Sequence, residues 1–506
     1  METAIKSGRN TIALMAACLA SLMFGLEISS VPIILPTLER VLDGSFNDLQ
    51  WIMNAYTIAC TTVLMASGAL ADRYGRKRVF VISVALFALT SLICGISQSV
   101  SVLIVSRFLQ GMSGGSMLIC QVAILSYQFQ EEKERSKAFA VWGIIFGIGL
   151  GFGPIIGGII VAMVNWEWVF LIHVPLSIIT LFLAYLGITE SRDPNAKKLD
   201  VGGIVTLSVS VFALIYYIVK GADVGFLSHE GICIIAVAII SFIIFILVEK
   251  RSTHPMFDFS VFRIRNFSGA IMGSIGMNFS FWPLMIYLPI YFQSGLGYDV
   301  VETGLSLLAY TLPTLLVPPL AERLMLRYRA GIVIPAGLFT IGLGFFLMKW
   351  GSSTAGADWL TMLPGCLLSG TGLGLTNTPV TNTTTGSVSS DRAGMVSGID
   401  MSARLITLAI NIALMGFILL QTIQIDLTTS LPETVSTDQL HSIAQNIGSG
   451  NLTTITQNHP ELSSINSLEV IFHTALVKGF GSVMLYGGVG VWVLALSSFI
   501  IFKEKK

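Results

Sequence analysis

Two charged side chains stand alone inside long apolar stretches of this sequence. Glu27 is the only ionisable residue in the run 11–35, and Arg107 is the only one in the run 101–122. A charge near the centre of a bilayer costs about 2.5–3.5 kcal/mol on insertion scales, so such residues usually face a protein interior and serve a function. We expect Glu27 to carry a proton or to balance a cationic substrate, with Arg107 as its partner. The alternatives are a structural acid bonded to neighbouring helices and an arginine that binds backbone carbonyls.

A second acid and arginine lie close together in the sequence. Asp400 and Arg404 are four residues apart, which places them on one helix face, where they can neutralise each other. Asp400 is therefore either a substrate contact or the internal partner of Arg404, and we favour the internal pair. The other candidate pocket residues combine aromatic faces with sparse polar groups, as suits amphipathic or cationic ligands: Trp51, Asn54, Tyr56, Gln121, Asn278 and Trp282.

The composition indicates that the apolar segments carrying these residues lie in a lipid bilayer. The chain has 506 residues, of which 53% are hydrophobic and 11% charged, with a mean hydropathy of +0.78. These values exclude a soluble enzyme. About fourteen apolar runs reach the spanning length of roughly 20 residues: 11–35, 50–70, 79–97, 101–122, 137–163, 168–189, 201–220, 231–249, 267–292, 303–320, 332–350, 360–380, 395–423 and 477–502.

The charges between these runs predict the topology. Lys and Arg gather in alternate connections, as at 73–78 and 133–137, whereas the connections between them carry mainly acids. Basic loops stay in the cytoplasm, so we expect both termini to be cytoplasmic. The first run is long and has no small-residue cleavage site, so it is predicted to be a spanning helix. The six cysteines lie in six different runs, and we expect neither disulfides nor a metal site.

The short segment 67–79 connects two apolar runs and carries five charges. Its glycine at 68 would let the helix ends approach, and its basic residues would hold the turn on the cytoplasmic side. The segment resembles the loop G-x-L-A-D-R-x-G-R-K of the major facilitator superfamily, in which the loop is a latch made and broken as the carrier changes state. The matching residues are Gly68, Leu70, Ala71, Asp72, Arg73, Gly75, Arg76 and Lys77. A solvated basic turn that only determines topology is the alternative.

Other segments resemble the fourteen-helix drug:proton antiporter branch of this superfamily. The first apolar run is similar to L-D-x-T-I-V-N-V-A-L-P, with Glu27 at the aspartate position, and Arg107 opens an R-x-x-Q-G pattern that the family links to proton transfer. His173 replaces the usual Asn in a W-R-W-x-F-x-I-N-x-P pattern. It is either a hydrogen-bonded imidazole, which we favour, or a group that joins proton movement. An exporter signature, G-x-x-x-G-P-x-x-G-G, matches Gly149, Gly153, Pro154, Gly157 and Gly158, although helix packing alone would also explain these glycines.

The resemblance implies an all-α integral membrane protein with the major facilitator fold. We expect an N-terminal six-helix bundle at 1–190, two linker helices with flanking loops at 191–265, and a C-terminal six-helix bundle at 266–506. The segment 424–476 has no Lys or Arg and is predicted to be a polar extracytoplasmic loop, with a helix around 438–447. Its three histidines are irregularly spaced and do not favour a metal site.

These features together predict a proton-coupled antiporter that exports small amphipathic compounds, cationic or neutral, by alternating access. The expected partners are a small-molecule substrate, protons and the lipid bilayer, and not nucleic acid. We expect a monomer in the bacterial inner membrane, with no cofactor. A dedicated exporter of one endogenous metabolite, such as a siderophore, is the first alternative. A non-transporting receptor or enzyme on a carrier scaffold is the second, although the sequence shows no catalytic set or phosphate loop.

Overall fold

The computed structural model describes residues 2–192, 200–252, 259–354, 356–388, 393–432, 435–449, 455 and 468–502. Within these residues the secondary structure is helical. The chain divides into two compact units. The first contains Met1–Val31, Ile52–Leu214 and Leu227–Asp258, and the second contains Pro32–Trp51, Ile215–Phe226 and Phe259–Lys506.

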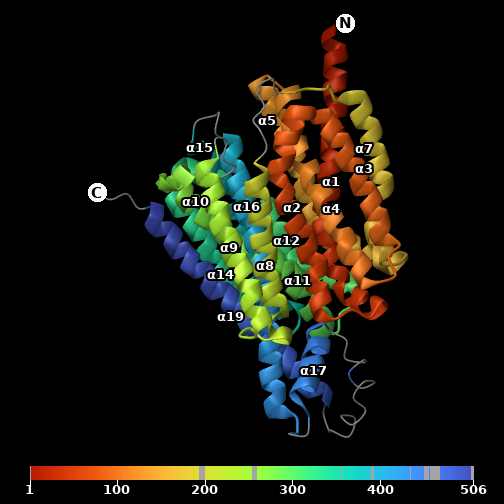
Figure 1. Ribbon diagram of the computed structural model, residues 1–506, viewed down its shortest axis with the longest axis vertical. Helices are drawn as coiled ribbons and strands as arrows, with labels where there is room; N and C mark the ends of the chain where they lie inside the picture. Colours follow the sequence, from red (N-terminus) through yellow and green to blue (C-terminus); the bar gives the residue numbers. More distant parts are fainter. Residues whose placement is uncertain are drawn as a thin grey trace. The chain divides into compact units, whose positions relative to one another are not determined.

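The helices of the first half follow the predicted apolar runs (Figure 1). They are α1 (Glu2–Leu42), α2 (Phe46–Tyr74), α3 (Arg76–Gly95), α4 (Val100–Gln128), α5 (Glu132–Met163), α6 (Glu167–Leu171), α7 (His173–Gly187), α8 (Val201–Val224) and α9 (His229–Arg251). The run 168–189 forms two helices, α6 and α7, separated only by Ile172. In the first unit α3 packs against α4, α6 and α7, so these helices form the frame that supports Arg107 and His173.

The second half contains the remaining helices. They are the 3₁₀ turn η1 (Phe259–Arg263), α10 (Arg265–Asn278), α11 (Phe281–Ile290), the π-helical turn η2 (Tyr291–Gly295), α12 (Val300–Leu316), α13 (Pro318–Arg327), α14 (Ala330–Ser352), α15 (Trp359–Gly386), α16 (Ala393–Ser430), α17 (Thr437–Ser449) and α19 (Leu468–Phe502). Pro318 starts α13 because proline fits the first turn of a helix but not its interior, and it divides the predicted run 303–320. In the second unit α14 packs against α15 and α19.

Twelve described helical segments are long and apolar enough to cross a membrane. Two further long helices, α2 and α15, have 29 and 28 residues and cover the predicted runs 50–70 and 360–380. Both carry several Thr and Asn residues among their apolar side chains. Helices therefore cover all of the predicted runs, and an all-α multi-pass membrane protein is confirmed.

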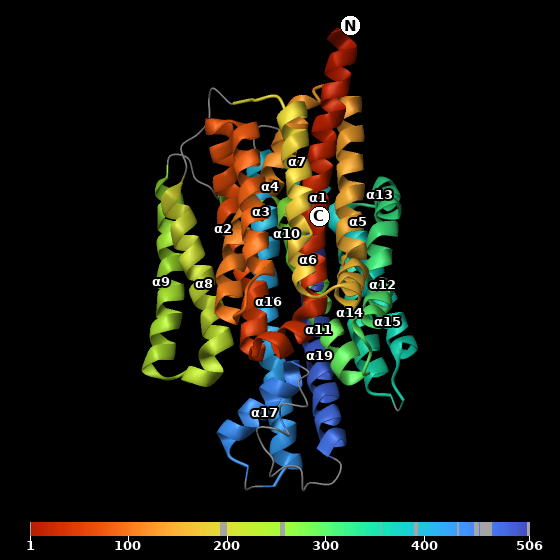
Figure 2. The same ribbon diagram turned by 90° about the vertical axis from the view of Figure 1, so that its right-hand side faces the viewer.

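The two predicted linker helices, α8 and α9, lie side by side (Figure 2). The hydroxyl of Ser210 on α8 donates a hydrogen bond to the carbonyl of Ala238 on α9, with an Oγ to O distance of 2.8 Å. A buried hydroxyl between two apolar helices satisfies its hydrogen bond on the neighbouring backbone, which links the pair. The domain boundaries at 190 and 265 stay a prediction.

The predicted polar segment 424–476 is more helical than expected. Helix α16 continues to Ser430 and α19 starts at Leu468, while α17 covers the helix predicted around 438–447. The extension of α16 buries Leu427, and α17, which packs against α16, buries Ile443. Apolar side chains at helical spacing therefore continue the helix where the overall polarity predicted a loop. His459 lies outside the described residues.

Candidate functional site

The structure brings Glu27 and Arg107 together inside the first unit. Glu27 lies on α1 and Arg107 on α4, 80 residues apart, and Arg107 Nη1 donates to Glu27 Oε1 in a salt bridge. Both side chains are 0% exposed. The second carboxylate oxygen, Glu27 Oε2, and the second terminal nitrogen, Arg107 Nη2, have no hydrogen-bond partner among the described residues. His173 Nδ1 lies 3.4 Å from Glu27 Oε2, a contact that is an ion pair only when the imidazole is protonated. The pair is therefore fully buried, with one carboxylate oxygen and one guanidinium nitrogen that lack hydrogen bonds in this part of the chain, and such a pair is costly to maintain.

Three groups hold Arg107 in place. Its Nη1 also donates to Gln110 Oε1 at 2.7 Å, and its Nε donates to the carbonyl of Ile52 at 3.2 Å. Gln110 in turn donates from Nε2 to the hydroxyl of Ser91 on α3 at 2.8 Å. These bonds connect α2, α3 and α4 around one guanidinium. Arg107 is thus bonded directly to α1 and α2 and, through Gln110, to α3, so it both pairs with Glu27 and binds a backbone carbonyl.

Aromatic rings and a close backbone contact complete the surroundings of Arg107. Its guanidinium carbon lies 4.3 Å from the centroid of the Tyr56 ring and 5.8 Å from that of Phe170, within cation–π range. A Cβ added at Gly111, one turn along α4, would come within 2.2 Å of the Tyr56 carbonyl oxygen. Glycine at 111 therefore allows α2 and α4 to approach closely enough for Tyr56 to cover the arginine.

The glycines of the exporter signature pack α5 against α1 beside Glu27. A Cβ at Gly149 would lie 2.9 Å from the Leu22 carbonyl oxygen, and one at Gly153 would lie 1.8 Å from Ser29 Oγ. Ser29 Oγ donates to the Gly149 carbonyl at 2.9 Å. Pro154, Gly157 and Gly158 lie within α5 as predicted, since α5 continues through the proline. The motif therefore forms a tight contact with the helix that carries Glu27, one turn from the carboxylate.

Three of the candidate pocket residues lie in the first unit. Asn54 is buried on α2, and neither of its side-chain polar atoms has a hydrogen-bond partner among the described residues. Gln121 on α4 accepts from Trp142 Nε1 at 2.8 Å, while its own Nε2 has no such partner in that same part of the chain. Tyr56 covers Arg107 as described above. Buried amides that lack partners are unusual, and in a carrier they are candidate contacts for a polar ligand group.

Aromatic side chains that the sequence analysis missed connect these polar groups. Ring centroids are 6.3 Å apart for Tyr56 and Phe24, 6.1 Å for Phe24 and Phe146, and 5.9 Å for Phe146 and Trp142, the last pair being stacked. The four rings form an aromatic row from α2 through α1 to α5. The available signal was that Phe24, Trp142 and Phe146 lie in apolar runs, and this does not separate rings that line a pocket from rings that pack in the core.

The remaining pocket candidates lie in the second unit. The Trp51 ring centroid is 6.0 Å from that of Tyr216. Asn278 is buried at the end of α10 and donates from Nδ2 to the Ser274 carbonyl at 2.9 Å. Trp282 is partly exposed, and its ring contacts that of Phe281 at a centroid distance of 4.5 Å. Asn278 and Trp51 thus have local partners, which makes them weaker candidates for ligand contacts.

Asp400 and Arg404 form the predicted internal pair on α16. Arg404 Nη2 lies 2.9 Å from Asp400 Oδ2. The other carboxylate oxygen accepts a hydrogen bond from Ser274 on α10, and the guanidinium donates to Asn377 Oδ1 at 2.7 Å and to Thr381 Oγ1 at 2.9 Å on α15. Ser274, Asn377 and Thr381 were missed because their distance in sequence gives no signal of contact. Both oxygens of Asp400 have partners, whereas Arg404 Nε has no hydrogen-bond partner among the described residues.

The 67–79 hairpin has a defined geometry in the first unit. Gly75 joins α2 to α3 with a φ of +116°, a conformation that other residues rarely adopt. The carboxylate of Glu190 lies against the start of α3 and accepts from the backbone nitrogens of Lys77 and Arg78, both at 3.1 Å. An anion at a helix N-terminus is favourable, so Glu190 stabilises this turn. The sequence analysis missed Glu190, although an acid directly after an apolar run was a visible signal.

Other residues of the hairpin are placed less tightly. Arg73 is exposed, and Arg76 donates its backbone N–H to the Ser191 carbonyl at 3.0 Å. A Cβ at Gly68 on α2 would lie 3.6 Å from the side chain of Ile119 on α4, which is an ordinary contact distance. The closest approach of α2 and α4 therefore lies at Gly111 instead. The side chain of Asp72 lies outside the described residues.

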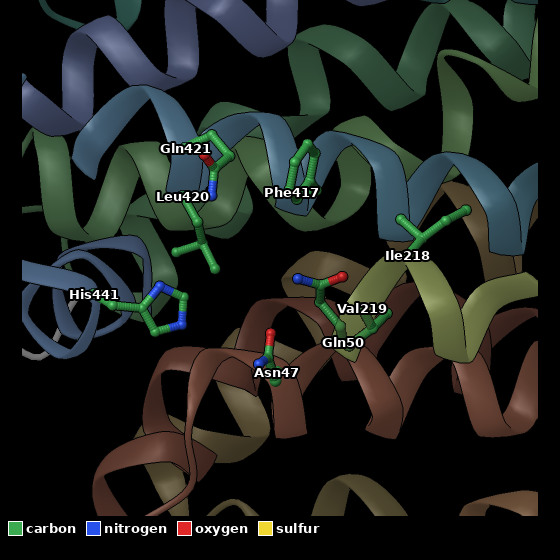
Figure 3. A pocket seen from close by; sticks show the side chains of 8 residues that line it. All are labelled: Asn47, Gln50, Ile218, Val219, Phe417, Leu420, Gln421 and His441. Atoms are coloured by element: carbon green, nitrogen blue, oxygen red, sulfur yellow. The ribbon is translucent and has the colours of Figure 1, made fainter. Parts of the chain in front are cut away.

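Two of the hollows that described residues line lie in the second unit. Figure 3 shows the smaller one, where Asn47, Gln50 and His441 point toward a space beside α16. Its cavity volume is about 10 Å³, enough for one water molecule and too small for an organic cargo. The larger hollow has a volume of about 890 Å³ and is lined by Lys349, His473 and Lys478 together with hydroxyl side chains. Lys478 is neutralised there by a salt bridge to Asp426.

Comparison with known proteins identifies the chain. The profile of the Major Facilitator Superfamily matches residues 17–411. This chain belongs to the Major Facilitator Superfamily. It is therefore a membrane transporter that binds a small-molecule substrate, and it is not an enzyme, which confirms the fold and the family that the sequence motifs predicted.

Individual relatives are multidrug and antibiotic resistance proteins. The chain is 31% identical over 438 residues to the multidrug resistance protein Stp of Mycobacterium tuberculosis, covering 86% of this chain and 80% of that protein. It is 31% identical over 416 residues to the tetracenomycin C resistance and export protein of Streptomyces glaucescens, covering 81% and 76%. It is 28% identical over 420 residues to the quinolone resistance protein NorB of Staphylococcus aureus, covering 81% and 88%. These relatives support a drug exporter.

A solved structure agrees on the fold. A bacterial homologue of the human lysosomal transporter Spinster, in an inward-facing and unoccupied conformation, matches with a TM-score of 0.65 and 14% identity. The match covers 98% of this chain and 97% of the other.

Proposed function

We propose that this superfamily member is a proton-coupled antiporter that exports small amphipathic compounds. One observation carries the proposal: Glu27 is a fully buried carboxylate with one oxygen paired to Arg107 on another helix and the other oxygen without a hydrogen-bond partner among the described residues. A buried acid that is half satisfied can gain or lose a proton at a tolerable cost, whereas a fully bonded pair cannot.

A proton at Glu27 changes the force between two helices. When the carboxylate is ionised, its attraction to the guanidinium of Arg107 holds α1 against α4. When the carboxyl is neutral, that attraction falls to the strength of an ordinary hydrogen bond, and the two helices can separate or turn. The tight contact between α1 and α5 at Gly149 and Gly153 means that α5 would move with α1. Protonation is thereby coupled to a rearrangement of the first unit.

The proton gradient supplies enough free energy for export. Each inward proton contributes about 1.4 kcal/mol per pH unit and about 2.3 kcal/mol per 100 mV. Since 1.4 kcal/mol corresponds to a tenfold concentration ratio, one pH unit and 100 mV together support roughly 500-fold extrusion of an uncharged cargo. One proton per cycle is therefore sufficient for a resistance phenotype.

The aromatic row and its amides support an amphipathic cargo. Tyr56, Phe24, Phe146 and Trp142 form the row, and Gln121 bonds Trp142. In the same unit Asn54 and Gln121 have side-chain polar atoms without hydrogen-bond partners among the described residues. Apolar walls with a few polar groups suit drug-sized organic molecules. Ring faces also attract cations.

The direction and location of transport are part of the proposal. The three relatives are bacterial and are named as resistance proteins, and the name of the Streptomyces glaucescens relative also contains the word export. The alternating basic loops predict that both termini are cytoplasmic in the inner membrane. We propose a monomer, because the buried pair and the aromatic row lie within one unit of one chain.

A dedicated exporter of one endogenous metabolite is the second candidate. It is favoured by the relative that is named after a single compound, tetracenomycin C. A substrate panel in proteoliposomes separates the two functions. Saturable transport of one metabolite with none of the panel compounds would support the dedicated exporter.

Transport by the purified protein in proteoliposomes tests the proposal. The panel contains ethidium, tetracenomycin C and a quinolone, and an imposed pH gradient drives accumulation. We expect gradient-dependent transport by the wild-type protein and at least a 100-fold loss in Glu27→Gln, because an amide cannot ionise. The matched control is Glu230→Gln, the same substitution at an exposed acid in the first turn of α9, which should transport normally.

Two results would overturn the assignment. If transport by the wild-type protein does not depend on the pH gradient, proton coupling is excluded. Normal gradient-driven transport by Glu27→Gln would show that Glu27 does not carry the coupling proton.

A further inference from the structure

His173 lies next to the buried pair and faces hydrogen-bond acceptors with both ring nitrogens. It is the first residue of α7, and its side chain is 0% exposed. Its Nε2 lies 3.1 Å from the Met23 carbonyl oxygen on α1. Its Nδ1 lies 3.3 Å from the Phe170 carbonyl oxygen and 3.4 Å from Glu27 Oε2, the carboxylate oxygen that Arg107 does not bind.

This arrangement does not suit a neutral imidazole beside an ionised carboxylate. Neutral imidazole has one N–H and one lone pair, so one ring nitrogen would direct its lone pair at oxygen. In a buried site such a contact between two acceptors is repulsive and is not relieved by water. One additional proton between Nδ1 and Oε2 removes the repulsion, whether it resides mainly on the ring or on the carboxyl.

The neighbouring groups determine how the charge balances. Besides Glu27, the charged or titratable groups close to the site are Arg107 on α4, Tyr56 and Cys60 on α2, and Cys94 on α3. From α3 the Phe87 ring meets the imidazole edge to face at a centroid distance of 5.6 Å. Tyrosine and cysteine buried in this way are neutral, so the charge of the site is decided by Glu27, His173 and Arg107.

We propose that Glu27 and His173 hold the coupling proton jointly, between Oε2 and Nδ1, and that its loss lets Oε2 turn to the free Nη2 of Arg107. This inference rests on the proposed function and deepens it. With the proton, Glu27 binds Arg107 through one oxygen and the three side chains carry a net charge of +1. Without it, the carboxylate can bind the guanidinium through both oxygens, the ring keeps its bond to Met23, and the net charge is zero. No bond other than that to the proton forms or breaks.

The two states differ in how strongly α1 is tied to its neighbours. In the proton-loaded state Glu27 connects α1 to α7 and, through one bond, to α4. In the proton-free state the bidentate pair ties α1 to α4 more tightly, since two parallel N–H···O bonds are stronger and more directional than one. The net charge of the loaded state also disfavours a cationic cargo nearby. Proton and cation would therefore exclude each other from this unit, as antiport requires.

Nitrogen NMR of the purified protein in nanodiscs tests the joint proton site without any cargo. The chain has only six histidines, so ¹⁵N-histidine labelling gives a small spectrum, and His173→Asn identifies the His173 signals. Between pH 5 and 9 we expect the wild-type protein to show a His173 Nδ1 signal typical of a proton shared with an oxygen. We expect this signal to be absent in Glu27→Gln, because an amide cannot share the extra proton.

A fixed neutral tautomer across this range, unchanged by Glu27→Gln, would overturn the inference and leave His173 as a structural bridge between α1 and α7. Because this measurement needs no transport, it is independent of the proposed function. If the His173 signal depends on Glu27 but Glu27→Gln still transports under a pH gradient, the proposed coupling role of Glu27 is wrong. The shared proton site between Glu27 and His173 is then still supported.

A transport readout covers the case in which Glu27→Gln does not fold. His173→Asn keeps a hydrogen-bonding side chain but cannot hold the proton, and asparagine is the usual residue in the resembling motif. We expect His173→Asn to retain ethidium exchange across proteoliposomes without a gradient and to shift the pH dependence of gradient-driven transport toward acid by at least one unit. His229→Asn, at an exposed histidine of α9, is the matched control and should leave the profile unchanged. An unshifted profile in His173→Asn would contradict the joint site.

Discussion

The two units each bury an acid–arginine pair, and the pairs differ in construction. Glu27 and Arg107 come from different helices and leave one oxygen and one nitrogen without hydrogen-bond partners among the described residues. Asp400 and Arg404 lie one turn apart on α16, and both carboxylate oxygens are bonded. A pair within one helix stays neutral however the helices move, whereas a pair between two helices changes its energy with their separation. In the proposed mechanism the first construction converts a proton into helix motion.

Arg107→Gln gives the largest effect that we expect. The substitution leaves the Glu27 carboxylate buried without its cation, and breaking a buried pair costs about 3–5 kcal/mol. Transport should fall at least 100-fold, and the melting temperature in detergent should fall by several degrees. Arg323→Gln on the exposed face of α13 is the control. The double variant Glu27→Gln with Arg107→Gln should recover melting temperature but not transport. A stable and active Arg107→Gln would show that the pair between helices is dispensable.

Gly153→Ala tests the packing of α5 against α1 without changing any charge. The added Cβ would overlap Ser29 Oγ on α1, so α1 and α5 must move apart, at a cost of about 1–3 kcal/mol. Thermal unfolding should show the loss, and transport should fall about tenfold or more. Gly143→Ala on the same helix has nothing within 4 Å of the new Cβ and should be neutral or slightly stabilising. Equal behaviour of the two variants would exclude a tight contact between α1 and α5.

Asp400→Asn should have a smaller effect than any change at Glu27. Arg404 keeps its bonds to Asn377 and Thr381, and the amide can still accept from Ser274. Losing one charge-assisted bond of about 1.5 kcal/mol corresponds to a loss of transport of about tenfold, with an unchanged dependence on the pH gradient. Initial rates at several gradients check this. If Asp400→Asn removes the gradient dependence, the roles of the two pairs are reversed.

Glu190→Ala should have the smallest effect. It removes the carboxylate at the start of α3, which the hairpin uses as a helix cap in water-accessible surroundings. We expect the melting temperature to fall by about 1 °C relative to the exposed control Glu134→Ala, with transport within twofold of the wild type. A transport loss as large as that of Arg107→Gln would show that the hairpin controls the cycle more strongly than the buried pair.

The fold was largely predictable from the sequence, and the site only in part. Hydrophobic length alone located the helices, because a spanning helix must be apolar for about 20 residues. The Asp400–Arg404 contact followed from a four-residue spacing. The bond between Glu27 and Arg107 was proposed only because each is isolated in its run, and no spacing rule reaches across 80 residues. The orientation of His173 and the partners Gln110 and Ser91 depend on how helices pack, which periodicity does not specify.

We propose that the Glu27 site exchanges a proton for cargo. Proteoliposomes with an entrapped pH indicator, held without an imposed gradient, measure this exchange directly when ethidium is added to one side. We expect protons to move opposite to ethidium in the wild-type protein and not to move in Glu27→Gln, with Glu230→Gln indistinguishable from the wild type. Proton movement of wild-type size in Glu27→Gln would show that the exchange does not depend on Glu27.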